Sequence, residues 1–120
     1  MKTRSSAEDY LETILLLSKK KGLVRSIDIA EELGYSKPSV SVAMKKLKAD
    51  GMVIVDEYGY INLTGQGLKT ASEVYDRHSV VFKLLVSIGV SEEVAEEDAC
   101  KIEHILSDET FDAIKKKLNS

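Results

Sequence analysis

The chain has 120 residues, of which 43% are hydrophobic and 31% are charged, with one proline and no tryptophan. This length suits one compact domain or two small ones that share a long helix, and the composition favours a mostly helical protein over a disordered one. No apolar run approaches the length needed to span a bilayer, and the polar N-terminus lacks the apolar core of a secretory signal. We therefore expect a cytoplasmic protein that does not interact with membranes.

The net charge of -3 is unevenly distributed along the chain. Residues 1–64 carry ten Lys and Arg against nine acids, whereas residues 65–120 carry seven against eleven. Proteins that only bind nucleic acid nonspecifically are usually basic overall, so any DNA binding must come from a local patch with directed contacts. The single cysteine, Cys100, excludes an intrachain disulfide and leaves open a buried small residue, a metal ligand or a reactive thiol.

Helix start and stop signals divide the first part of the chain into two helices. Ser5 or Ser6 can cap a first helix that Gly22 ends, with an apolar stripe that includes Leu11, Ile14 and Leu15. Ser26 can cap a short amphipathic helix that ends at Gly34. A tight turn after Gly34 then separates it from the next helix.

A third helix and a β-hairpin follow. Lys37 and Pro38 start the helix, because proline is tolerated in a first turn, and Gly51 ends it. Residues 52–55 and 60–63 are rich in β-branched and aromatic side chains and predict two short strands joined by a turn. Helix, turn, helix and hairpin in this order indicate a winged helix-turn-helix.

The second half predicts three further helices. Thr64 can cap a long helix to about Ile88, and Ser91 and Ser107 can cap two more, the first of them extending through His104. The apolar face predicted for the long helix, with His78 in register, comprises Leu68, Ala71, Tyr75, Phe82 and Leu85. The long helix therefore links the two halves of the chain.

In a helix-turn-helix the second helix enters the major groove of DNA, and its N-terminal residues reach bases and phosphates. The residues suited to this role are Arg25, Ser36, Lys37, Pro38, Ser39, Ser41, Lys45 and Lys46. Residues 26–51 could instead be a plain helical hairpin whose lysines face solvent. The hairpin that follows makes DNA binding the favoured interpretation.

Three segments carry side chains that could bind a metal ion. On a helix, Cys100, Glu103 and His104 project from one face, because they lie at offsets of three and four. The full candidate set is Asp9, Glu12, His78, Cys100, Glu103 and His104. Carboxylate and imidazole donors suit Mn(II) or Fe(II), and a thiolate shifts the preference toward softer or later metals. Each residue alone has a structural explanation, as a solvated first turn, a satisfied core histidine or a buried cysteine, but the set favours metal binding.

The whole chain resembles the metal-dependent bacterial repressors that include the diphtheria toxin repressor and the manganese transport regulator. The resemblance is carried by Glu8–Glu12, Ile29–Leu33, Ser36–Ser41, Leu63–Thr64 with Gly67, Arg77–His78 and Glu97–Ser107. It implies a homodimer that binds a palindromic operator, with its interface in the C-terminal helices. It also implies metal ligands between the two domains at the six positions named above. Some members continue into an SH3-like domain where this sequence stops, so the expected form is the short one without that domain.

The resemblance implies a mostly α fold in two domains. We expect a winged helix-turn-helix DNA-binding domain with a two-stranded wing at 1–64. A long helix at 65–88 would join it to the rest of an all-α metal-binding and dimerisation domain at 65–120. The expected function is repression of metal uptake genes with Mn(II) or Fe(II) as co-repressor, without enzymatic activity or a small-molecule substrate. A metal-independent winged-helix repressor and a small carboxylate-histidine metalloenzyme are the alternatives.

The sequence departs from both branches of this family. The manganese branch usually has Glu at the position of Cys100, and the iron branch has Met in place of Asp9. Phe82 and Glu96 stand where the iron branch has a carboxylate and a histidine of its ancillary metal site. Val42 replaces a glutamine that some relatives carry in the recognition helix, so their operator sequence cannot be transferred.

Overall fold

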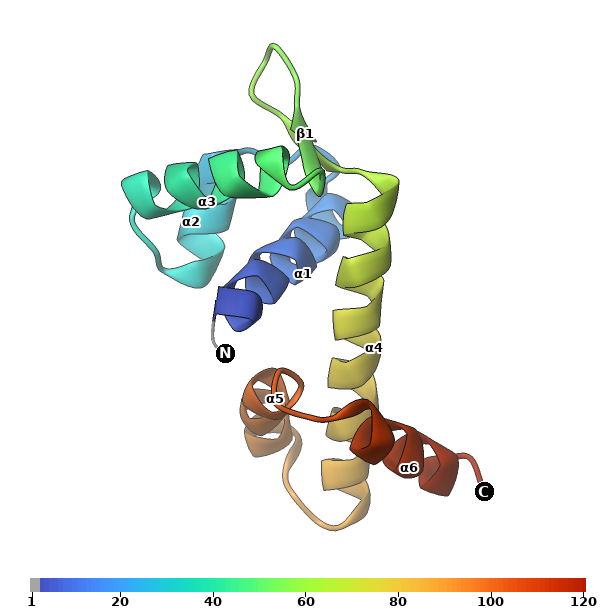
Figure 1. The fold of residues 1–120 in the computed structure, drawn as a ribbon. Coiled ribbons are helices and arrows are strands. Elements are labelled where there is room, and N and C mark those ends of the chain that lie inside the picture. The colour runs from blue at the N-terminus through green and yellow to red at the C-terminus, as the bar shows by residue number, and fades with distance from the viewer. Residues whose placement is uncertain (1–2) are drawn as a thin grey trace. The chain divides into compact units, whose positions relative to one another are not determined.

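The computed structural model describes residues 3–120, with side chains from residue 6 onward. These residues form six helices and one two-stranded antiparallel sheet, as Figure 1 shows. The elements are, in chain order, α1 (Thr3–Lys21), α2 (Ser26–Leu33), α3 (Lys37–Ala49), β1 (Val53–Val55), β2 (Ile61–Leu63), α4 (Gly65–Ser87), α5 (Glu92–Ile102) and α6 (Asp108–Leu118). None of these helices combines the length and apolar character needed to cross a membrane. The predicted mostly helical fold with a two-stranded wing is confirmed.

The chain divides within α4 into two compact units, one ending at Ser72 and the other spanning Glu73–Ser120. The first contains α1 to α3, both strands and the start of α4. The second contains the rest of α4 with α5 and α6.

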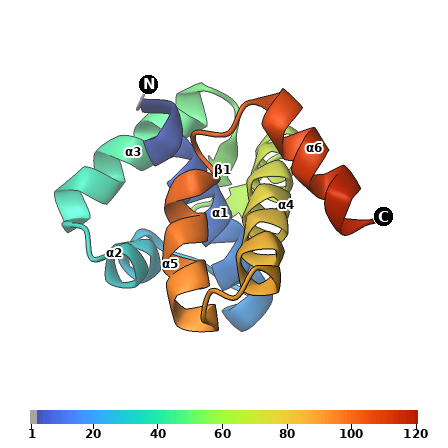
Figure 2. The ribbon, with the colours of Figure 1, turned by 90° about the horizontal axis from the view of Figure 1, so that it is seen from below.

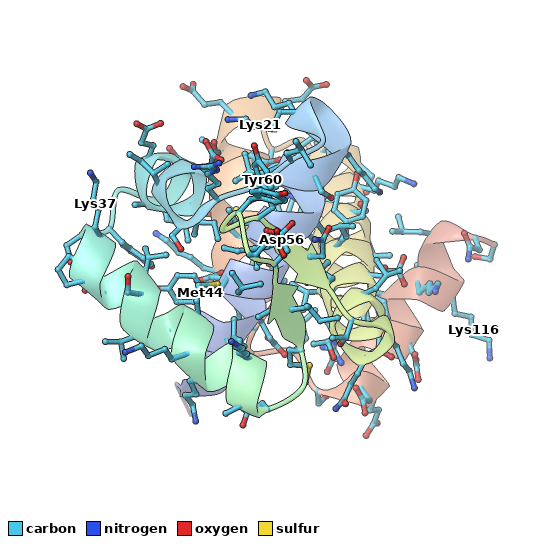
Figure 3. All side chains as sticks on the ribbon, turned by 90° about the horizontal axis from the view of Figure 1, so that it is seen from above. Lys21, Lys37, Met44, Asp56, Tyr60 and Lys116 are labelled. Atoms are coloured by element: carbon cyan, nitrogen blue, oxygen red, sulfur yellow. The ribbon has the colours of Figure 1, made fainter. Side chains whose placement is uncertain are left out.

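Helix α1 supplies the centre of the first unit's core. Its stripe of Leu11, Ile14 and Leu15 is buried, as the spacing of these residues predicts. The other elements bury Ile29, Ala30, Val40, Met44, Leu47, Val53 and Ile61 in the same cluster. Figure 3 shows Met44 turned inward from α3 and Lys37 projecting away at the start of that helix. The face of α3 opposite the core therefore stays accessible.

The starts of the first two helices differ from the prediction. Helix α1 already includes Ser5 and Ser6, because extending a helix adds a hydrogen bond for each residue fixed. Ser26 is the first residue of α2, and the N-cap is Arg25. The carboxylate of Asp28 supplies the capping interaction by accepting the backbone N–H of Arg25 at 2.8 Å. Asp28 therefore supplies the capping interaction that the sequence predicts for Ser26.

The wing is a short hairpin with a side-chain-stabilised turn. Val53 pairs with Leu63 and Val55 with Ile61. In the turn, Oδ1 of Asp56 accepts the backbone N–H groups of Tyr58 and Tyr60, each at 2.9 Å. One acidic side chain thus satisfies two donors that the short strands leave unpaired.

The start of α4 is held against the start of β1. The hydroxyl of Thr64 donates to the carbonyl of Gly51 at 2.6 Å and accepts the N–H of Gly67 at 3.0 Å, which confirms the predicted N-cap. A Cβ at Gly67 would overlap the carbonyl oxygen of Met52. Only glycine permits this close approach, so the wing and α4 depend on Gly67 for their packing.

The buried face of α4 is rotated from the predicted one. Leu68 and Tyr75 are 47% and 40% exposed. The buried residues are Ala71, Val74, His78, Val80 and Val81. With 3.6 residues per turn, Leu68 and Tyr75 lie about 80–100° around the helix from the middle of the stripe formed by Ala71, Val74, His78 and Val81. The predicted burial of Leu68 and Tyr75 is wrong, whereas the burial of Ala71 and His78 agrees with the prediction.

Contacts from Arg77 tie the start of α6 to α4. The Arg77 guanidinium donates to the carbonyl of Leu106 at 2.8 Å and pairs with the carboxylate of Asp108. It also lies 5.0 Å from the centre of the Phe111 ring. Lys115 pairs with Asp76 of α4 at 3.1 Å. These contacts lie within the second unit and fix the course of the chain after α5.

Candidate metal centre and nucleic-acid interface

The outward face of α3 gathers the residues predicted to bind DNA. All the predicted positions on this segment are exposed: Ser36, Lys37, Pro38, Ser39, Ser41, Lys45 and Lys46. Val42, between them, is 68% exposed although it is apolar. The opposite face carries the buried Val40, Met44 and Leu47. The helix therefore presents hydroxyls, lysines and one apolar side chain to a partner.

The N-terminus of α3 is ordered by its own cap. The hydroxyl of Ser36 accepts the N–H of Ser39 at 3.3 Å and lies 2.9 Å from the Ser39 hydroxyl. Pro38, in the first turn, removes one N–H that would otherwise need a partner. Hydroxyls and helix N–H groups at such an end suit phosphate oxygens.

Arg25 lies beside the wing. Its guanidinium carbon is 4.5 Å from the centre of the Tyr60 ring of the hairpin, a cation–π distance. Arg25 is exposed and precedes α2 directly. It therefore places a positive charge between the helix-turn-helix and the wing.

His78 is the buried centre of the donor cluster in the second unit. Nδ1 of its imidazole lies 2.7 Å from Oε1 of Glu103, and Nε2 lies 3.0 Å from Oε2 of Glu96. The Glu103 side chain is 1% exposed, whereas that of Glu96 is 59% exposed. The ring thus has one buried and one accessible carboxylate, one at each nitrogen.

These carboxylates set the charge of the histidine. Chiefly through its hydrogen bond, Glu103 raises the pKa of His78 to about 9, against the opposing effect of burial and with a further contribution from Glu96. His78 therefore carries its second proton at neutral pH, and a cation bound to the ring must displace that proton.

Cys100 and Glu96 share one face of α5. They lie one turn apart, and ligand atoms from His78, Glu96 and Cys100 all lie within 4.8 Å of one another. Imidazole, carboxylate and thiolate are the donors that later first-row divalent metals use in proteins. The residues present therefore fit a transition-metal ion.

The prediction that one helix extends through Cys100, Glu103 and His104 is wrong at its C-terminal end. Helix α5 ends at Ile102, with Glu103 as its C-cap and His104 in the turn that follows. The N–H of His104 donates to the carbonyl of Lys101, three residues back, so the last turn tightens instead of continuing the helix. Nε2 of His104 still lies 3.5 Å from Oε2 of Glu103. Glu103 thus faces two imidazoles, and His104 lies beyond the end of the helix that carries Cys100.

Asp9 and Glu12 belong to the first unit. They lie one turn apart on α1, both partly buried, so their carboxylates share one side of that helix. Within the second unit, Glu103 contacts both His78 and His104, and Cys100 lies near His78.

Glu96 is a further donor beside His78 that lies outside the predicted set of six. Its position four residues before Cys100 gave a signal, because this spacing puts both side chains on one helix face. The contact with His78 depends on how α5 packs beside the C-terminal part of α4, shown in Figure 2, and no local spacing specifies that packing.

Comparison with known proteins identifies the family. Residues 2–61 match the model described as the iron-dependent repressor N-terminal DNA-binding domain, and residues 64–120 match that of the iron-dependent repressor metal-binding and dimerisation domain. The chain belongs to the iron-dependent repressor family. Over 112 residues it is 38% identical to the transcriptional regulator MntR of Escherichia coli O6:H1, covering 93% of this chain and 72% of that protein. It is equally identical over 112 residues to MntR of Bacillus subtilis strain 168, covering 93% and 79%.

Two solved structures with similar sequences share the fold. The crystal structure of IdeR from T. acidophilum aligns with a TM-score of 0.83 at 28% identity, covering 94% of this chain and 54% of that one. The structure of the manganese regulator SloR aligns with a TM-score of 0.81 at 32% identity, covering 94% and 53%. The chain thus spans a little over half the length of these two solved relatives.

Proposed function

We propose that this chain is a metal-dependent, DNA-binding repressor of metal uptake genes, with Mn(II) or Fe(II) as its co-repressor. The observation that carries the proposal is the buried imidazole of His78 between the carboxylates of Glu103 and Glu96, beside Cys100. Relatives named as manganese regulators support the choice of metal. We assign residues 1–64 to DNA binding and 65–120 to metal binding and dimerisation.

DNA binding is assigned to α3, Arg25 and the wing. In this proposal Ser36, Ser39 and the helix N–H groups bind phosphate, and Lys45 and Lys46 add charge along the groove. The exposed Val42 can contact the methyl group of thymine, the apolar feature of the major groove. The exposure of all these side chains supports the proposal.

The proposed ligands come from both units. They are Asp9, Glu12, His78, Cys100, Glu103 and His104. When bound, a divalent ion would supply positive charge shared by carboxylates on α1 and donors beside α4 and α5. Glu103 orients the His78 ring through Nδ1, which prepares the imidazole to act as a ligand.

Without that shared charge, carboxylates of the two units repel one another and favour arrangements that keep them apart. The DNA-binding units of a dimer then sample many separations, of which few match the spacing of two operator half-sites. A metal ion bound by ligands from both units would narrow this range of separations. DNA and metal must then strengthen each other's binding, since coupling between two sites is reciprocal.

Dimerisation is assigned to the C-terminal helices. Phe111, Ile114 and Leu118 form an apolar stripe on α6, and no residue of this helix is buried within the chain. Ile105, just before α6, is 80% exposed. A second copy that covers these side chains would give a twofold-symmetric protein suited to a palindromic operator. We assign no enzymatic activity and place the regulator in the cytoplasm with the DNA.

The test begins with selection of a binding site from random duplexes in the presence of Mn(II). Fluorescence anisotropy then measures the affinity for this site with Mn(II), with Fe(II) under anaerobic conditions, and with a chelator. We expect Glu12→Gln to lose the metal response while folding normally, and the matched control Glu31→Gln on the exposed face of α2 to keep it. A full metal response in Glu12→Gln would contradict the role of α1, and unchanged affinity in the chelator would favour the metal-independent repressor.

A further inference from the structure

We infer that Glu96 is a metal ligand of this protein, completing with Nε2 of His78 and Sγ of Cys100 a three-donor site for a thiolate-binding divalent ion such as Fe(II), Co(II) or Zn(II). The site lies wholly within Glu73–Ser120. The inference rests on the proposed function, whose ligands include His78 and Cys100, and it adds a residue that the six-ligand set lacks.

The two ring nitrogens of His78 contact different carboxylates. Nδ1 faces the buried Glu103 at 2.7 Å, and Nε2 faces the exposed Glu96 at 3.0 Å. A metal-bound histidine almost always donates the N–H of its other nitrogen to a carboxylate, carbonyl or water. With the ion at Nε2, the Nδ1–H group would donate its hydrogen bond to Oε1 of Glu103. Glu103 is then the orienting carboxylate of this site, and Glu96 is the ligand.

The positions of the donors favour the Nε2 side for a soft ion. Glu96 and Cys100 lie one turn apart on α5, and their ligand atoms and that of His78 lie within 4.8 Å of one another. In a bound site these donors would lie about 2.0–2.3 Å from the ion, which their side chains would reach by turning toward one another. Ala95 and Ala99 of α5 are buried, so the donors beside them project from a helix that is packed in place.

The donor set also determines which metals the site takes. One imidazole, one thiolate and one carboxylate suit later first-row ions, and three protein ligands leave a position open for water or a further donor. The site would therefore load a thiolate-preferring ion without any ligand from α1.

The test is an anaerobic titration of the full chain with cobalt(II) chloride, followed by the near-ultraviolet thiolate-to-cobalt charge-transfer band. We expect the band in the natural protein and its loss in Cys100→Ser. Loss of a group that hydrogen-bonds a metal ligand typically lowers metal affinity by about 10- to 100-fold, and we expect this decrease in Co(II) affinity for Glu103→Gln. Glu96→Gln, which removes a ligand, should weaken Co(II) binding at least as much. Glu96 is 59% exposed at its side chain, so folding should tolerate the change. Glu97→Gln, the same charge change one residue along α5, is the matched control.

Two results would overturn the assignment. One is a Glu96→Gln protein that titrates like the Glu97→Gln control. The other is loss of the band in a double variant with Asp9→Asn and Glu12→Gln, because the site needs no donor from α1. Operator binding of these proteins with Mn(II) is measured in parallel. If Glu96→Gln keeps both its metal response and its affinity for Co(II), the Glu96 site alone is refuted. If the natural protein binds Co(II) but its operator binding does not respond to metal, the proposed function alone is refuted.

Discussion

Oε1 of Glu103 lies 2.7 Å from Nδ1 of His78, which joins the residue that caps the end of α5 to the buried face of α4. Glu103 is 2% exposed and also faces His104. A buried carboxylate between two imidazoles is costly unless it is paired, so this arrangement fixes both rings relative to α5.

The first prediction concerns Glu103. Replacing it with Gln keeps the shape of the side chain and removes the charge that orients His78. We expect the metal response of operator binding to be lost, with the circular dichroism of the folded protein retained. Glu97→Gln should behave like the natural protein, and a Glu103→Gln protein that responds fully to Mn(II) would contradict the role given to this carboxylate.

The second prediction concerns the junction of the wing and α4. Gly67→Ala places a methyl group against the carbonyl of Met52, and such overpacking costs about 1–3 kcal/mol or more. Gly65→Ala, two residues earlier in the same helix, meets no atom within 4 Å and should be neutral or stabilise by up to about 1 kcal/mol. Urea unfolding measures the free energy of unfolding of both variants. Equal values for Gly67→Ala and Gly65→Ala would show that the junction relaxes around the added methyl group.

The third prediction concerns pH and Asp28. Lys21 donates to its carboxylate at 2.6 Å, and together with the backbone N–H of Arg25 this holds the pKa of Asp28 below its usual 3.8. A lowered pKa in the folded state stabilises the protein above the unfolded pKa, and this contribution disappears as the pH falls through the folded value. We expect Asp28→Ala to cost about 0.5–2 kcal/mol at neutral pH and less in acid.

Urea unfolding at several pH values checks this dependence. The exposed Glu32→Ala on the same helix is the control. A cost for Asp28→Ala that stays constant into strong acid would show that the charge of Asp28 contributes nothing.

The fourth prediction concerns the lysines of α3. If Lys45 and Lys46 contact phosphates, each change to Ala should weaken operator binding and reduce the slope of log Kobs against log salt concentration by about 1. Lys116→Ala removes the same charge from α6, a helix to which we assign no DNA contact, and should leave the slope unchanged. If the Lys45, Lys46 and Lys116 variants all gave the same slope, Lys45 and Lys46 would not be phosphate contacts.

Local signals in the sequence predicted most of the elements. Spacing, caps and glycine stops located the three N-terminal helices, the hairpin and the caps at Thr64, Ser91 and Ser107. These features depend on residues a few positions apart, which a sequence displays directly.

Features set by distant contacts could not be predicted in the same way. The cap of α2 depends on Asp28, which Lys21 holds from seven residues away. The contact of Glu96 with His78 depends on how α5 packs beside α4. The set of six metal ligands and the operator contacts stay predictions that the proposed variants address.

The central claim is that metal and DNA binding are coupled, and a closed thermodynamic cycle tests it most directly. Operator affinity is measured with and without saturating Mn(II), and Mn(II) affinity with and without saturating operator, all on the full chain. We predict that both ratios exceed one and are equal, within the roughly 5- to 150-fold range typical of coupled sites. Ratios of one on both arms would contradict the account.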